Sequence, residues 1–86
     1  MLLVTAAACA DDRDDITRRD CERLRDHVVG LRLERVTADR EQHKAALVAS
    51  LGDGFIDACL TSITPTGLRC RLDARATDAL AACRDQ

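Results

Sequence analysis

The stretch Cys21-Glu-Arg-Leu-Arg-Asp-His-Val-Val-Gly-Leu31 is the clearest indication of the fold class. Its apolar positions step by three, four and three residues, which is the spacing of one face of an α-helix: Cys21, Leu24, Val28 and Leu31. The pattern predicts an amphipathic helix that starts at about Thr17 or Asp20 and ends at about Val36. A cysteine lies at the beginning of its buried face.

A second helix is predicted over residues 40–51. Asp39 is a candidate N-cap, and Gln42 follows three residues later, as in a variant of the capping box. Gly52 suits the end of this helix because glycine adopts positive φ without a steric penalty. The sequence therefore predicts a break in the chain at Gly52.

Three shorter helical segments follow. Asp53 can cap a helix over residues 54–62, Thr64-Pro65 is a strong start signal for a helix that fades near Arg75, and Thr77-Asp78 can cap a short last one. No stretch alternates as a β-strand does. We therefore predict an all-α fold, a compact array of four to five short helices. Its predicted core comprises eight residues: Leu24, Val28, Leu47, Leu51, Phe55, Leu60, Leu68 and Leu72.

The composition limits both the core and the class of partner. A chain of 86 residues forms one domain and buries only about 60–65% of its unfolded surface. Phe55 is its one aromatic residue, so covalent cross-links gain importance. With 15 acidic and 13 basic residues the net charge is −2, which argues against a nucleic-acid-binding protein.

Four cysteines lie in the predicted helical region and form an even set, as in a disulfide framework. Cys59 and Cys70 lie at similar distances before and after the Thr64-Pro65 break. In a tight helical hairpin they would come opposite each other, which favours Cys59–Cys70 together with Cys21–Cys83. Cys70 and Cys83 also flank the break at Thr77, so Cys21–Cys59 with Cys70–Cys83 is a rival pairing.

The fifth cysteine, Cys9, closes the short apolar segment 1–10, which resembles the end of a signal peptide. Ala6-Ala7-Ala8-Cys9 resembles a bacterial lipobox, which makes Cys9 a candidate for lipidation. Alternatively, Ala8-Cys9-Ala10 is an A-x-A cleavage site, or the segment stays intact and Cys9 is a free thiol. Residues 11–19 are predicted to form a charged tether and 20–86 the helical domain. No stretch approaches the roughly 20 apolar residues of a bilayer span.

Motifs for metal binding and catalysis are missing from the sequence. It contains no C-x₂-C, no H-x₃-H, no nucleophile elbow and no phosphate-binding glycine loop. His27 and His43 lie on or beside the apolar faces of the first two helices. We expect packed or flanking imidazoles whose nitrogen meets a carboxylate or carbonyl. The alternative is a periplasmic module that binds a small ligand or metal through His27 or His43. We expect no catalytic residues and no cofactor.

The order of these features resembles the small cysteine-containing lipoproteins of high-GC Gram-negative bacteria, a group without an assigned activity. The resemblance covers about residues 6–84 and rests on Ala-Ala-Ala-Cys9, on Leu51-Gly-Asp-Gly-Phe55-Ile-Asp-Ala-Cys59 and on Ala79-Leu-Ala-Ala-Cys83. It implies export to the bacterial cell envelope, as an outer-membrane lipoprotein or in the periplasm. We expect a non-catalytic interaction module whose partner is an envelope protein or a second copy. Its membrane contact would be through a lipid on Cys9 alone.

Overall fold

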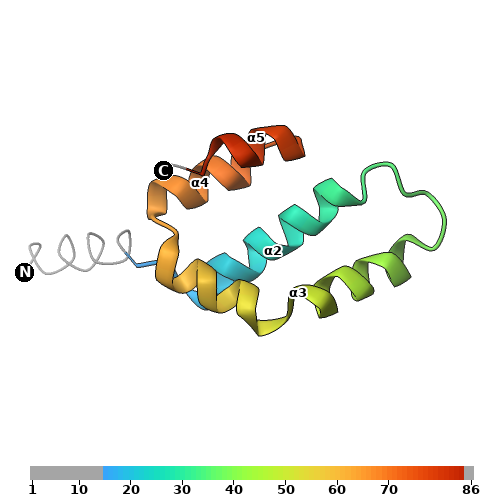
Figure 1. Cartoon of the computed structure of the whole chain (residues 1–86), viewed down its shortest axis with the longest axis horizontal. Helices are drawn as coiled ribbons and strands as arrows, with labels where there is room; N and C mark the ends of the chain where they lie inside the picture. The colour runs from blue at the N-terminus through green and yellow to red at the C-terminus, as the bar shows by residue number, and fades with distance from the viewer. Residues whose placement is uncertain (1–14, 85–86) are drawn as a thin grey trace, which may run out of the picture.

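Four helices make up the fold of residues 15–84, which are the residues that the computed structural model describes (Figure 1). The lipidation candidate Cys9 and the segment 1–10 lie outside this range. No strand occurs within it, so the prediction of an all-α fold is confirmed. The helices are α2 (Arg18–Arg32), α3 (Arg40–Ser62), α4 (Pro65–Asp73) and α5 (Thr77–Ala82).

A capping box starts α2 at Thr17, one of the two predicted positions. The Thr17 hydroxyl accepts a hydrogen bond from the Asp20 amide at 3.2 Å, and the Asp20 carboxylate accepts one from the Thr17 amide at 3.0 Å. Ile16 already packs against the core. The folded domain thus begins before residue 20, inside the segment predicted as a tether, and α2 ends at Arg32 instead of Val36.

The break predicted at Gly52 is present, as a kink inside α3. Gly52 has φ 60° and ψ −165°, a backbone conformation open essentially to glycine alone. The two helices predicted on either side therefore form one bent element. Asp39 is the N-cap residue, as predicted, but it adopts the left-handed conformation and its side chain makes no capping bond, so the predicted capping box is wrong. The Arg40 guanidinium instead donates to the carbonyls of Leu33 and Val36, which fastens the α2–α3 connection.

The favoured disulfide pairing is wrong, and the rival pairing is present. Cys21 is bonded to Cys59 and Cys70 to Cys83, each with a Cα–Cα distance of 5.9 Å. The chain does not fold back along α3 at the turn before Pro65. Instead α2 lies at the centre, α3 runs antiparallel to it, and α4 and α5 pack on α2 and on each other (Figure 1). Cys59 therefore meets α2, and Cys70 meets the end of α5.

The core surrounds the Cys21–Cys59 bridge and does not extend along all of α3. Leu24 and Ile56 complete the buried cluster with the two cysteines. All but one of the other predicted core residues are partly buried. Four of them pack against this cluster: Val28, Phe55, Leu68 and Leu72. Leu47 and Leu51 are half-buried elsewhere. The prediction for Leu60 is wrong, since it is 40% exposed. Burial on α3 follows Ile56 and Cys59, and Leu60 lies beside that face.

By length and composition α3 is long and apolar enough to cross a membrane, so the prediction that no stretch approaches a bilayer span is wrong. Within the fold, three features indicate a helix of the folded domain. Gly52 interrupts helical geometry in its middle, and a bilayer core leaves such a break without water to satisfy its backbone. Cys59 is bonded to Cys21, and Asp53 pairs with Arg18.

We predict that Ile56→Ala destabilises the oxidised protein by about 2–5 kcal/mol, because Ile56 is 1% exposed and its loss leaves a cavity beside the disulfide. Leu60→Ala is the control, an aliphatic truncation one turn further along α3, and should cost less than about 1 kcal/mol. Urea denaturation of both variants measures the difference. Equal losses would contradict this description of the core.

Candidate functional site

The first half of α3 presents an apolar surface with little tertiary cover. None of the residues before Gly52 in this helix is fully buried; Leu47, Val48 and Leu51 are half-buried, and residues 40–46 are exposed. A shallow hollow of about 390 Å³ opens on its outer side. We call the residues that line this hollow the distal face: Glu41, Lys44, Ala45, Val48 and Ala49.

The distal face suits contact with another helix better than binding of a small molecule. Ala45 and Ala49 have short side chains, so the backbone of a partner can approach closely. Val48 supplies the largest apolar side chain of the hollow, and Glu41 and Lys44 place one charge of each sign at its border. In Figure 1 this part of α3 lies at the end of the molecule opposite the turn into α4.

His27 belongs to a second region, between α2 and the connection from α4 to α5. Its Nε2 lies 2.6 Å from the carbonyl oxygen of Ala74. A carbonyl only accepts hydrogen bonds, so Nε2 must carry the hydrogen and donate. An open pocket of about 610 Å³ adjoins this contact and is lined also by Leu31 and Leu72. The imidazole thus meets a carbonyl, as predicted, and ties α2 to the backbone after α4.

The structure does not bring His27 and His43 together. His43 is exposed in the first turn of α3, so the expectation that it packs is wrong. His27 contacts the Ala74 carbonyl from α2, whereas His43 lies in the exposed first turn of α3, on the far side of the Gly52 kink from the Cys21–Cys59 bridge. Within residues 15–84, no group of three or more His, Cys, Asp or Glu side chains is arranged to hold a metal ion.

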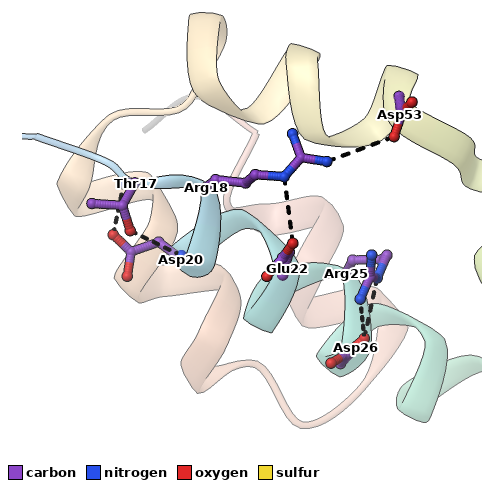
Figure 2. Close-up of polar contacts among 7 residues, drawn as sticks. All are labelled: Thr17, Arg18, Asp20, Glu22, Arg25, Asp26 and Asp53. Carbon is purple, nitrogen blue, oxygen red and sulfur yellow. Dashed lines mark hydrogen bonds and ion pairs between the residues drawn. The ribbon is translucent and has the colours of Figure 1, made fainter.

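Several arginines that could attract an anionic ligand are already engaged. Arg18 pairs with Glu22 at 3.4 Å and reaches Asp53 on α3 at 3.7 Å, and Arg25 pairs with Asp26 at 3.1 Å (Figure 2). The Arg18 side chain is 58% exposed and that of Asp53 91%, so this ion pair adds at most about 1 kcal/mol. These pairs make a solvated, mixed-charge surface.

A third pocket, of about 480 Å³, lies between the first turn of α2 and α4. Ile16, Leu68 and Leu72 form its apolar part, and charged groups of both signs surround it: Asp15, Asp20, Asp73, Arg23 and Arg69. Asp20 is already occupied by the capping box of α2 and by Arg23 at 3.9 Å. The pocket therefore has no uniform charge that would select an anion or a cation.

Comparison of the chain with models of protein families, with curated proteins and with solved structures finds no significant match.

We predict that His27→Ala lowers the free energy of unfolding by about 1–3 kcal/mol, because the half-buried contact is lost and the Ala74 carbonyl loses its donor. His27→Gln retains an N–H donor and should recover part of the loss. His43→Ala is the exposed control and should change stability by less than about 0.5 kcal/mol. Urea unfolding of the three variants tests this; equal effects of the two alanine variants would refute a structural role for His27.

Proposed function

We propose that this protein is a non-catalytic helical interaction module of the bacterial cell envelope, anchored by a lipid on Cys9. The observation that carries the proposal is the distal face of α3, an apolar strip bordered by Glu41 and Lys44 that has little tertiary cover, in a domain whose core gathers around the Cys21–Cys59 bridge. Exposed apolar surface bordered by polar residues is typical of protein contact sites, and the distal face has this arrangement on a small scale.

The disulfides support a location outside the cytoplasm, in the cell envelope. Cytosolic thiol systems keep cysteines reduced, so structural bridges belong mainly to exported proteins. Here Cys21, Cys59, Cys70 and Cys83 are all placed for bridging, and the first pair lies in the centre of the core. Cys9 stands apart from this set and follows the lipobox-like Ala6-Ala7-Ala8. Export with lipidation at Cys9 accounts for all five cysteines.

The size of the distal face limits the strength of the contact. It spans about two helical turns, which is far less than the roughly 800 Å² per partner of a standard stable interface. We therefore propose a transient contact with a helix of another envelope protein. A second copy of this chain is the other possible partner, and the two are separated by experiment.

We predict that the full-length protein, expressed in a Gram-negative host, incorporates labelled palmitate and that Cys9→Ser abolishes the labelling. Thr5→Ser, a change to another hydroxyl residue before the lipobox-like motif, is the control and should be labelled normally. Mass spectrometry of the mature N-terminus completes the test. A mature protein that begins at Asp11 would refute lipidation and leave export intact.

We predict that a photo-crosslinking amino acid at Ala49 forms a discrete adduct in the envelope and that Val48→Glu suppresses it, because a charge in the hollow opposes apolar contact. Thr66→Glu, at an exposed position on α4, is the matched control and should leave the adduct unchanged. Sedimentation of the purified protein separates self-association from a different partner. An adduct insensitive to Val48→Glu would refute a contact at the distal face.

A further inference from the structure

The two disulfides lie in different surroundings. Cys21 is 0% exposed and Cys59 2%, and both belong to the core cluster that joins α2 to α3. In the second bridge Cys83 is buried but Cys70 is only half-buried. Cys70 is thus the one bridged cysteine that is not fully buried, whereas a soluble thiol reaches the first bridge only when the core opens.

The second bridge is the main attachment of α5. This helix has six residues, its N-cap Ala76 makes no side-chain capping bond, and none of its own residues is fully buried. Isolated helices shorter than about 12–15 residues are marginal in water. Among residues 75–84, the fully buried residue is Cys83 itself, directly after the helix. Without the bond to Cys70, α5 keeps only its contacts with α2 and α4, which include no fully buried side chain of the helix.

The hinge for a release of α5 lies after Ala74. Leu68 and Leu72 pack α4 against the core cluster, and His27 donates to the Ala74 carbonyl from α2. Ala74 is itself 6% exposed. The two residues that follow it, 75 and 76, are exposed and have no such hydrogen bond to α2. The segment that can leave is thus 75–84, while α4 stays docked.

We propose that Cys70–Cys83 is a redox clasp: a dithiol reduces it while Cys21–Cys59 stays closed, and segment 75–84 then detaches from α2. One thiolate of the dithiol attacks Sγ of Cys70, and Cys83 leaves as a thiolate that takes a proton from water. The second thiol of the reductant attacks the mixed disulfide, frees Cys70 and closes the reductant's own disulfide. Two electrons pass from the dithiol to the bridge.

Release of the clasp changes the surface of α2. Ala76, Thr77 and Asp78 lie across a hollow from the last turn of α2, around Leu31. When segment 75–84 detaches, this end of α2 loses its cover and the half-buried Leu31 becomes accessible. The reduced protein thus gains an apolar surface separate from the distal face of α3. Release of segment 75–84 follows from the burial of the bridges and the packing of α4 and α5, and it does not depend on the proposed function.

The test is graded reduction of the purified, oxidised full chain with dithiothreitol in the absence of denaturant. Iodoacetamide traps free thiols, and peptide mapping locates them on each cysteine. We expect Cys70 and Cys83 to be alkylated at least about tenfold faster than Cys21 and Cys59, because the core bridge reacts only through larger openings of the structure. Equal rates, or earlier reaction of Cys21 and Cys59, would overturn the proposal.

Hydrogen exchange on the partially reduced protein tests the release itself. Amide protection should fall in residues 75–84 and persist in α2, α3 and α4. Cys70→Ser combined with Cys83→Ser should reproduce this pattern without reductant, and Cys21→Ser combined with Cys59→Ser should instead lower protection throughout. Protection that persists in α5 after its bridge opens would overturn the proposal, as would loss of α2 and α3 together with α5.

Discussion

The bond between Cys21 and Cys59 is the constraint on which the rest of the structure depends. It fixes the register of the two longest helices, and the buried residues Leu24 and Ile56 gather around it. In the chain-entropy model, this bridge stabilises the fold by about 4 kcal/mol because it restricts the unfolded chain. The shorter Cys70–Cys83 loop contributes about 3 kcal/mol in the same model. With one aromatic residue in the chain, such a contribution is large relative to what apolar burial alone provides.

The position of this bridge divides the molecule into a packed part and an exposed part. Beyond Gly52, α3 lies against α2 and buries Ile56 and Cys59; before Gly52 it keeps its helical geometry but buries no residue completely. The positive φ of Gly52 permits the change of direction between the two parts. The distal face is a consequence of this division, since the small core ends before it reaches Ala45 and Val48.

The two helices on the other side of α2, α4 and α5, are held less firmly toward the C-terminus. The helix α4 is capped by Thr64, whose hydroxyl accepts from the Gly67 amide at 3.0 Å, and it packs Leu68 and Leu72 on the core. The next helix, α5, has neither a side-chain cap nor a buried residue of its own and relies on Cys83. The two disulfides therefore have different structural roles: the first organises the core, and the second retains a short peripheral element.

The sequence by itself determined the local structure. Thr17, Gly52 and Thr64-Pro65 act through short-range hydrogen bonds and backbone preferences, so the all-α class, the start of α2, the kink and the start of α4 could all be predicted. The tertiary structure alone decided the cysteine pairing, the exposure of Leu60 and the half-burial of Leu47, because each depends on how helices distant in sequence come together. Cys59 and Cys83 lie at similar distances from Cys70 in the sequence, and the packing of α4 on α2 selects between them. The distal face could not be predicted for the same reason: periodicity identifies the apolar side of a helix but not whether another helix reaches it.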